Sequence, residues 1–204
     1  MRIGIYGGSF DPPHIGHEHI LRSFIDQVEL DVVYVMPAFL PPHKQSITGT
    51  SPETRLEMSK LAFSKISNKI VVSDLEIKRQ GISYTADTIK HFVSEGNNEV
   101  FLLCGTDMFI TLDEWRNPSY IFENATIVHA IRENRVDGQR VIIQKKNDYI
   151  NRFNAKVLSL KIDAIELSSS QIRDMINLGD SRVEKFVSKE VLKLIEDKEL
   201  YKNR

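Results

Sequence analysis

Short apolar runs rich in valine and isoleucine alternate along most of this chain with longer segments of mixed polarity. We expect the apolar runs to form strands at residues 3–6, 32–36, 70–72, 100–104, 125–131 and 157–162. We expect the segments between them to form helices at residues 15–28, 52–66, 85–95, 118–124 and 149–154. Strand–helix alternation predicts an α/β fold, a doubly wound and mostly parallel sheet with helices on both faces.

The pattern changes after the last expected strand, where only helical segments follow, at residues 169–178 and 189–199. We therefore expect a core of residues 1–165 and a small C-terminal helical tail of residues 166–204. Because no long linker separates them, both are expected to belong to the same domain.

Residues typical of helix ends refine these boundaries. Ser51 followed by Pro52 predicts the start of one helix, and Gly96 predicts the end of another. The segment Arg132–Lys146 is rich in charge and contains Gly138, so we expect it to be a mobile loop.

The chain has 204 residues, of which 41% are hydrophobic, and a formal net charge of −1. This composition is typical of a globular protein with a core, and it argues against nucleic acid as a partner. Cys104, the single cysteine, excludes an internal disulfide and is expected to be a buried structural thiol. Apolar runs fall well short of the roughly 20 residues that span a bilayer, so we expect a cytoplasmic protein with no membrane contact. The oligomeric state stays open, a homo-oligomer included.

The segment 7–17, Gly-Gly-Ser-Phe-Asp-Pro-Pro-His-Ile-Gly-His, joins the first expected strand to the first expected helix. Ligands of doubly wound sheets bind at this place, beyond the carboxyl ends of the strands. Gly7 and Gly8 allow backbone amides to approach a phosphate closely, and a helix N-terminus favours an anion. Neither of the two common phosphate-loop fingerprints, Gly-x-Gly-x-x-Gly and Gly-Lys-Ser/Thr, occurs in the segment.

His14 and His17 stand three residues apart at the start of that helix, so their side chains lie on one face. Gly16 between them removes a side chain where a base or ribose would press against the helix. This spacing suits two imidazoles that point at one polyphosphate. Two alternatives stay open: the histidines only cap the helix, or they form a metal pair. Because a zinc site needs further ligands that the sequence does not supply convincingly, we expect no metal ligand from the protein.

The segment 7–17, with its His-x-Gly-His, resembles the signature of the nucleotidylyltransferase superfamily, which shares a Rossmann-like core with class I aminoacyl-tRNA synthetases. A synthetase does not fit the length of the chain, and no Lys-Met-Ser-Lys-Ser follows. The form Asp11-Pro12-Pro13-His14 is similar to bacterial nicotinate-nucleotide adenylyltransferases, whereas the pantetheine-phosphate branch usually has threonine at the position of His14.

Four later segments extend the resemblance over nearly the whole chain, in the order in which the family has them. They are Met36–Lys44 with its Pro-Pro-His-Lys, Ser83–Thr88, Gly105–Asp107 with Trp115, and Ser168–Arg173. Arg55 and Met58 match a further family stretch. Each of these also has a simpler interpretation. Pro-Pro-His-Lys would be a solvated loop, Ser83–Thr88 and the serines of Ser168–Arg173 would be helix caps, Trp115 would be a core residue, and Arg55 would be a surface helix residue.

Two departures from the family pattern concern the base contacts. Arg116 follows Trp115 where the family commonly has an aromatic residue, and Arg132-Glu133-Asn134 stands where Arg-Pro-Gly is often found. We expect these departures to affect details of ring binding and not the class of reaction.

The resemblance implies transfer of AMP from ATP to nicotinate mononucleotide, giving deamido-NAD and pyrophosphate in NAD biosynthesis, with Mg²⁺ accompanying ATP. The residues it implies in catalysis are His14, His17, Lys44 and Arg173. Those it implies in ATP binding are Gly7, Gly8, Ser9, Phe10, His14, His17, Gly105, Asp107, Ser168, Ser169 and Arg173. Those it implies in nicotinate-nucleotide binding are His43, Lys44, Tyr84, Thr85 and Trp115. Two alternatives stay open: transfer to nicotinamide mononucleotide or phosphopantetheine, and a non-catalytic nucleotide-sensing module.

Overall fold

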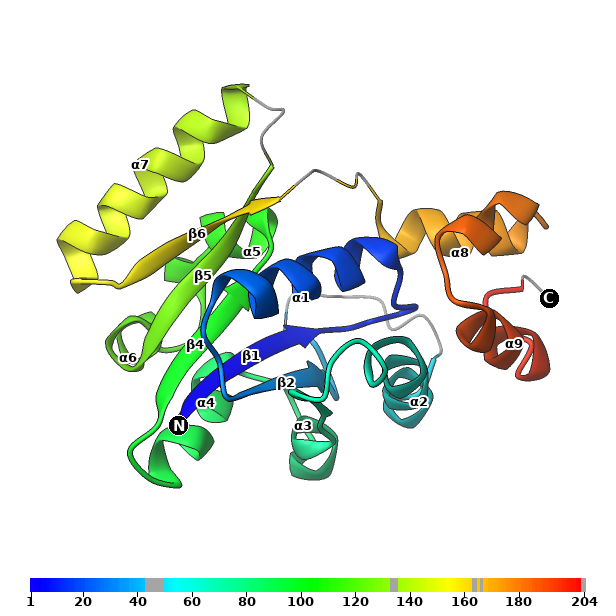
Figure 1. Cartoon of the computed structure of the whole chain (residues 1–204), viewed down its shortest axis with the longest axis horizontal. Coiled ribbons are helices and arrows are strands. Elements are labelled where there is room, and N and C mark those ends of the chain that lie inside the picture. Colours follow the sequence, from blue (N-terminus) through cyan, green and yellow to red (C-terminus); the bar gives the residue numbers. More distant parts are fainter. Residues whose placement is uncertain (43–49, 133–135, 163–164, 166, 203–204) are drawn as a thin grey trace.

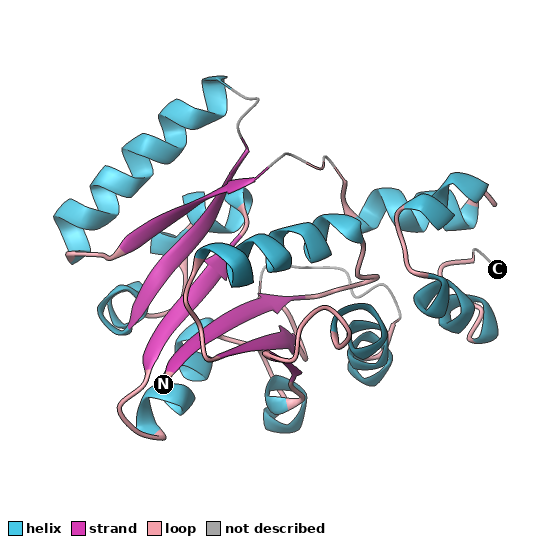
Figure 2. Cartoon of the chain, in the orientation of Figure 1, coloured by secondary structure: helices cyan, strands magenta, loops and turns pink. Residues whose placement is uncertain are grey.

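The computed structural model describes residues 1–42, 50–132, 136–162, 165 and 167–202. Its centre is a six-stranded sheet in which every pair of neighbouring strands is parallel, in the order β3-β2-β1-β4-β5-β6 (Figures 1 and 2). The strands are β1 (Arg2–Gly8), β2 (Val32–Pro37), β3 (Ile70–Val72), β4 (Glu99–Cys104), β5 (Ala125–Arg132) and β6 (Val157–Ile162). The predicted doubly wound Rossmann-like fold is confirmed, and all six predicted strands are present.

Helices cover both faces of the sheet (Figure 2). They are α1 (Ile15–Gln27), α2 (Pro52–Phe63), α3 (Leu75–Arg79), α4 (Thr85–Ser94), α5 (Thr106–Ile110), η1 (Leu112–Glu114), α6 (Pro118–Asn124), α7 (Val136–Phe153), α8 (Ser169–Asn177), η2 (Ser181–Lys185) and α9 (Lys189–Asp197), where η marks a 3₁₀ helix. None of the described helices is long and apolar enough to cross a bilayer.

Both faces of the central strands are buried, which explains why these strands read as unbroken apolar runs. On β1, Ile3 and Ile5 point to the core beneath α4, α5, α6 and α7. Tyr6, with the opposite orientation, belongs to the core beneath α1 and α2. The thiol of Cys104 is buried, as predicted, and its burial raises the pKa to about 12, so it stays protonated at neutral pH.

The predicted helix boundaries at Ser51 and Gly96 hold. The Ser51 side chain accepts a hydrogen bond from the Thr54 backbone at 3.1 Å, and Pro52 opens α2. Gly96 follows the end of α4 with a φ of +142°, a conformation that glycine adopts without strain.

The prediction of a mobile loop over Arg132–Lys146 was wrong. Residues 136–153 form the long helix α7, so the helix predicted at 149–154 is only its end, and 133–135 lie outside the described residues. The helix is held to the core by Ile142 and Tyr149, of which 6% and 0% is exposed. Packing of this amphipathic face outweighs the propensity cost of Gly138 near its start.

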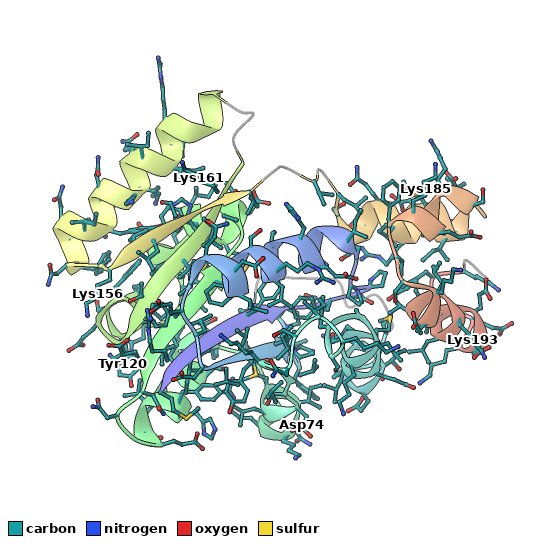
Figure 3. The ribbon with its side chains drawn as sticks, in the orientation of Figure 1. Asp74, Tyr120, Lys156, Lys161, Lys185 and Lys193 are labelled. Carbon is teal, nitrogen blue, oxygen red and sulfur yellow. The ribbon has the colours of Figure 1, made fainter. Side chains whose placement is uncertain are left out.

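The C-terminal helices pack on α2 and not on the sheet. Met58 of α2 joins a small apolar core with residues from α8, η2 and α9, namely Ile172, Val183, Val187, Val191 and Ile195. Lys161 on β6, Lys185 on η2 and Lys193 on α9 are exposed to solvent (Figure 3). Through α2, the C-terminal helices are brought to the carboxyl end of the sheet (Figure 1).

Candidate active site

A cavity of about 440 Å³ lies beyond the carboxyl ends of β1 and β4, where the strand order of the sheet reverses. This is the switch point at which ligands of doubly wound sheets bind, and its volume is typical of a small-molecule site. The described lining comes mainly from the ends of β1 and β4 and from the starts of α1, α4 and α8: Tyr6–Phe10, His14, Gly16, His17, Ser83, Thr85, Gly105–Met108, Trp115, Ser168 and Ser169.

The turn after β1 is shaped by the ring of Phe10. A Cβ on Gly8 would lie 2.8 Å from that ring, so only glycine fits there, whereas a Cβ on Gly7 would meet no atom within 4 Å. Phe10 itself has a φ of +48°, a strained conformation for a bulky residue. Its ring is held in place by edge contacts with Tyr6 and Phe63. The packing of these rings fixes the shape of the turn.

His14 and His17 form a reciprocal cap at the start of α1. The Gly16 backbone donates to Nδ1 of His14, and the His14 backbone donates to Nδ1 of His17, each at 3.2 Å. In a neutral imidazole that accepts at Nδ1, the proton resides on Nε2. The capping interpretation is therefore right for Nδ1 of both rings. It leaves His14 with an Nε2–H donor, and both histidines line the cavity.

The imidazole of His14 is neutral at physiological pH. Burial lowers the pKa of His14 to about 4, because a charged ring would lose its hydration. A Cβ on Gly16 would lie 3.1 Å from the His14 ring, so this glycine makes room for the imidazole. Gly16 also lines the cavity, and the expectation that it leaves room for a base or ribose stays a prediction. The centroids of the His14 and His17 rings are 3.8 Å apart, so the two imidazoles lie directly beside each other.

Two arginines fix the backbone of the segment 7–17. Arg55 of α2 donates to the carbonyls of Ser9 and Phe39, both at 3.0 Å, and it is 5% exposed. The alternative of a surface residue was therefore wrong. Arg173 of α8 donates to the carbonyl of Asp11 at 2.8 Å. These charge-assisted bonds join the turn to α2 and to α8.

The N-terminus of α8 opens toward the same cavity as that of α1. Ser168 caps the helix, accepting from the Gln171 backbone at 3.2 Å while the Gln171 side chain accepts from Ser168 at 2.8 Å. Ser169 donates to the carbonyl of Pro12 at 3.0 Å. Two helix N-termini, each with a partial positive charge, thus converge on one space, an arrangement that suits a polyphosphate. The first amides of α1 are already bonded within the cap and to the carbonyl of Phe186, so this end of α1 offers its dipole and its histidine side chains.

Sequence analysis did not foresee that the C-terminal residues also hold the turn. The hydroxyl of Tyr201 donates to the Asp11 carboxylate at 2.6 Å, and the Ile15 backbone donates to the carbonyl of Phe186 at 2.9 Å. Burial and the nearby Asp11 carboxylate raise the pKa of Tyr201, so the phenol stays a donor. These contacts span nearly the whole chain, and no local pattern indicates them.

At the other end of the cavity, Ser83 and Thr85 line the approach to α4. The Ser83 hydroxyl accepts from the Phe39 backbone at 2.9 Å instead of capping the helix. In the described part of the chain, the side chain of Tyr84, the N-cap residue, makes no capping bond. The interpretation of this segment as a simple cap is therefore not supported, and α4 begins with uncapped amides beside Thr85.

Glu76 is a buried carboxylate in the cavity lining that sequence analysis missed. Burial raises the pKa of Glu76, while hydrogen bonds from Thr88 and Ser83 and the charge of Arg79 oppose the rise. The Thr88 hydroxyl accepts from Arg79 at 3.1 Å, and the Ser83 hydroxyl accepts from the Phe39 backbone. Each hydroxyl therefore has its own proton left to donate, and Thr88 donates it to Glu76. The Glu76 carboxylate is therefore the acceptor of the hydrogen bonds from Thr88 and Ser83.

The predicted nicotinate-nucleotide residues are brought together only in part. Thr85 and Trp115 line the cavity, and the half-buried Trp115 also packs on the main core. Tyr84 is not among the described lining residues. The guanidinium of Arg116 instead stacks over its ring, 4.3 Å from the ring centroid. Two further predicted residues, His43 and Lys44, lie outside the described residues.

The predicted ATP-binding residues converge. All of them except Arg173 line the cavity, from the turn after β1, the start of α1, the end of β4 and the start of α8. Arg173 instead holds the turn through its bond to the Asp11 carbonyl. Among the described residues, no group of three or more histidines, cysteines, aspartates or glutamates is placed to hold a metal ion.

The chain belongs to the cytidylyltransferase-like family, whose model matches residues 5–175. Relatives that it matches over nearly their full length are named "probable nicotinate-nucleotide adenylyltransferase": a protein of Clostridium botulinum (strain Alaska E43), 34% identical over 202 residues that cover 98% of each chain, and one of Exiguobacterium sibiricum, 35% identical over 202 residues that cover 98% and 99%. The predicted resemblance to that group is thereby confirmed.

A solved structure supports the fold. Plasmodium falciparum nicotinic acid mononucleotide adenylyltransferase complexed with NaAD superimposes with a TM-score of 0.79 over 98% of this chain and 97% of that one. At 22% sequence identity, this likeness concerns the fold.

Proposed function

We propose that this chain transfers the adenylyl group of ATP to the phosphate of nicotinate mononucleotide, which yields deamido-NAD and pyrophosphate. The observation that carries the proposal is the pair of imidazoles of His14 and His17, fixed by a reciprocal cap in a cavity onto which two helix N-termini open. The full-length relatives supply the chemical context, because they are named for this reaction.

In the proposed reaction an oxygen of the mononucleotide phosphate attacks the α-phosphorus of ATP. A new P–O bond forms as the bond from the α-phosphorus to the bridging oxygen breaks, and that oxygen leaves with the electron pair as part of pyrophosphate. The attacking phosphate is already ionised at neutral pH, so the protein needs no base. It has to align the two substrates and stabilise charge on the phosphate oxygens.

The donors of the phosphate end suit that task. His14 and His17 would donate to α- and β-phosphate oxygens as their charge develops, and the neutral state of His14 lets it donate without a change of protonation. Arg173 is not among the described lining residues and donates to Asp11 and Ser170; we propose that its remaining N–H groups hold the departing pyrophosphate. Lys44 is proposed to place the attacking phosphate.

We propose that Mg²⁺ enters with ATP, held by phosphate oxygens and water. The pocket fits a metal carried in this way, because Nδ1 of both imidazoles accepts from the backbone and the remaining nitrogen of the neutral His14 carries a proton, so it would donate to phosphate and would not ligate a cation. Bound there, Mg²⁺ would neutralise charge on the polyphosphate.

At the base end, the carboxylate of nicotinate would accept from the amides at the start of α4 beside Thr85, and Trp115 would stack on the ring. A carboxamide would turn its NH₂ group toward one of these donors. Leaving a buried donor unpaired costs on the order of 1–3 kcal/mol, so we expect at least a roughly tenfold preference in kcat/KM for nicotinate over nicotinamide mononucleotide.

The test measures pyrophosphate release from ATP and Mg²⁺ with nicotinate mononucleotide, nicotinamide mononucleotide and phosphopantetheine as separate acceptors. Release with nicotinate mononucleotide, at least tenfold faster than with its amide, is expected. Equal rates for the two pyridine nucleotides would reject the nicotinate assignment. Binding of ATP with no release from any acceptor would reject the enzyme and favour a nucleotide sensor.

We also propose that residues 166–204 fold in one unit with residues 1–165, because Arg173 and Tyr201 both bond to Asp11. Urea unfolding followed by far-ultraviolet circular dichroism and by the fluorescence of Trp115 should give coincident transitions. Two separate transitions would reject a single unit.

A further inference from the structure

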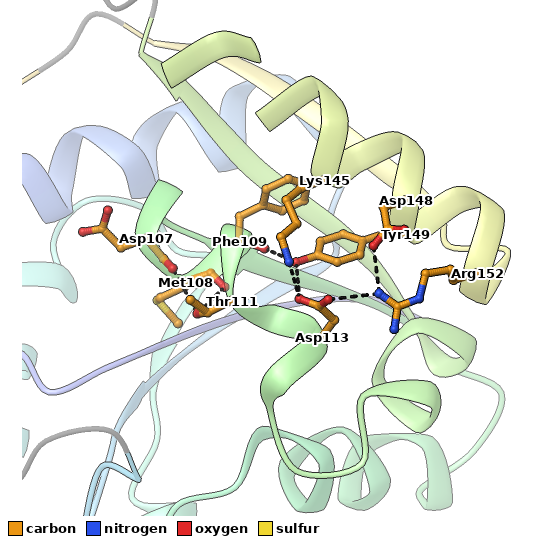
Figure 4. A network of polar contacts seen from close by, with 9 residues as sticks. All are labelled: Asp107, Met108, Phe109, Thr111, Asp113, Lys145, Asp148, Tyr149 and Arg152. Carbon is orange, nitrogen blue, oxygen red and sulfur yellow. Dashed lines mark hydrogen bonds and ion pairs between the residues drawn. The ribbon is translucent and has the colours of Figure 1, made fainter. Parts of the chain in front are cut away.

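One wall of the cavity is the segment 106–115, which contains α5 and η1. Asp107 in the first turn of α5 and Trp115 just after η1 both line the cavity, so the two ends of the wall face the substrates of the proposed function. Asp113 lies two residues before Trp115 and points the other way, toward α7 (Figure 4). Its side chain is 11% exposed.

Three side chains of α7 converge on the Asp113 carboxylate. Lys145, Tyr149 and Arg152 follow one another at spacings of four and three residues, so they lie on one face of the helix. Lys145 Nζ lies 2.8 Å from Oδ1, the Tyr149 hydroxyl 3.1 Å from Oδ1, and Arg152 Nη1 3.1 Å from Oδ2 (Figure 4). A single carboxylate thus joins the wall to about two turns of helix.

The contacts are of the strong, charge-assisted kind. Burial alone would raise the pKa of Asp113, but hydrogen bonds from Lys145 and Tyr149 and the charge of Lys145 hold it below its ordinary value. The carboxylate is therefore ionised at neutral pH and accepts from two cations and a phenol. Only one of these partners, Tyr149, is fully buried, so the bonds are formed at the edge of the core.

A second bond and a ring contact fix the first half of the wall. The one proton of the Tyr149 hydroxyl is shared between the Phe109 carbonyl at 2.7 Å and the Asp113 carboxylate at 3.1 Å, and the Phe109 ring stacks on His129 of β5 at 4.2 Å between centroids. Thr111 donates to the Asp107 carbonyl at 3.1 Å. The backbone of the wall is thus held from behind at Phe109 and at Asp113, with the substrate-facing residues outside these two points.

We propose that Asp113 is a positioning residue, which through α7 keeps Asp107 and Trp115 in the places that substrate binding requires. The proposal rests on the proposed function of the cavity. It also assigns a role to α7: the helix holds a wall of the site without touching the ligand.

The decisive variant is Asp113→Ala, with Asp148→Asn as its matched control. Asp148 bonds to the same Arg152 at 2.8 Å, but none of its described contacts reaches residues 106–115. Trp115 is the single tryptophan of the chain, so its fluorescence reports on the wall in the absence of any substrate. Both variants are compared with the unsubstituted chain well below their melting temperatures.

We expect Asp113→Ala to shift Trp115 emission to longer wavelength and to raise its quenching by acrylamide. The KM for nicotinate mononucleotide should rise about fivefold while kcat changes less than about twofold, because binding groups are displaced and the imidazoles are not. Asp148→Asn should leave emission, quenching and KM unchanged. If Asp113→Ala does not fold, Lys145→Met removes the 2.8 Å contact from the other side and should act in the same direction.

A folded Asp113→Ala variant, or Lys145→Met in its place, with unchanged emission and KM would overturn the proposal. So would an Asp148→Asn variant that changes both as strongly, because the effect would then come from α7 in general. If the unsubstituted chain transfers no adenylyl group but Asp113→Ala still shifts Trp115, the proposed function fails and the positioning role stands.

Discussion

The end of the cavity that we propose for phosphate, around His14 and His17, is held by segments from opposite ends of the chain. The end that we propose for the base, around Thr85 and Trp115, is held mainly by the middle of the chain. At the phosphate end the bonds come from charged side chains to backbone carbonyls of a strained turn. At the base end, the charged side chains Lys145 and Arg152 donate instead to a side-chain carboxylate, that of Asp113 behind the wall, and hydroxyl and ring contacts add to them.

This difference follows from what each end has to recognise. A polyphosphate is bound by donors whose positions must be fixed before it arrives, so the backbone that carries them is bonded from several sides. A pyridine ring is bound by stacking and by one polar group, which tolerates more adjustment. We therefore expect substitutions at the phosphate end to lower kcat, and substitutions at the base end to raise KM.

The largest effect is expected from His17→Ala, which removes one donor to the phosphates. We expect kcat to fall roughly 10²–10³-fold, about 3–4 kcal/mol. His17→Gln is the matched control, because glutamine at this position can restore the helix cap through its side-chain oxygen. Steady-state pyrophosphate release and urea unfolding should show both variants inactive but only His17→Ala destabilised. A His17→Ala variant that is active and easily unfolded would make the histidine structural.

The next effect is on stability and concerns His14. Because its pKa is about 4 in the folded state against 6.5 ordinarily, the unfolded chain binds more protons between those values. The free energy of unfolding should therefore be highest above pH 7 and fall by about 2–3 kcal/mol from this group as the pH drops to 4. His14→Asn keeps a good N-cap without titrating, so its urea unfolding should depend less on pH. If the free energy of unfolding depends equally on pH in both proteins, His14 is not the cause of the pH dependence.

At the base end, Trp115→Ala should weaken nicotinate mononucleotide binding by about 1–2 kcal/mol through the loss of stacking. The KM for the mononucleotide should rise roughly tenfold and the KM for ATP by less than twofold. The same rise is expected for nicotinamide mononucleotide, because stacking does not read the ring substituent. A lower kcat with unchanged KM would contradict the division between the two ends.

The smallest effect is expected from Tyr201→Phe, which removes only the hydroxyl that bonds to Asp11. Loss of one hydrogen bond to a carboxylate should cost about 1–2 kcal/mol, seen as a kcat reduced roughly fivefold with an unchanged KM for nicotinate mononucleotide. Tyr120→Phe, on α6 away from the lining, serves as the control. Wild-type kcat in a folded Tyr201→Phe variant would show that the turn does not depend on this bond.

The sheet and the phosphate end could be predicted because their determinants are local. Buried parallel strands appear as apolar runs bounded by turns, and segment 7–17 carries its glycines and histidines in one stretch. The four short helices α3, α5, η1 and η2, of three to five residues each, were missed because they are too short to show helical periodicity.

The role of the segment Arg132–Lys146 could not be predicted for a different reason. Its charges are typical of a solvated loop, and only the fold shows that Lys145 bonds to Asp113, 32 residues away. The contacts of Glu76 with Thr88 and of Tyr201 with Asp11 are likewise made between elements. A single sequence without tertiary structure carries no signal for them.

The two bonds to Asp11 from Arg173 and Tyr201 join residues 162 and 190 positions apart. A ribosome that adds roughly 5–20 residues per second needs about 10–40 s between making Asp11 and making Tyr201. Until Arg173 is made, the nascent chain has its glycine turn and both histidines but neither of these bonds. We therefore expect a chain stalled before residue 169 to carry the sequence signature of the site without the bonds that fix its turn.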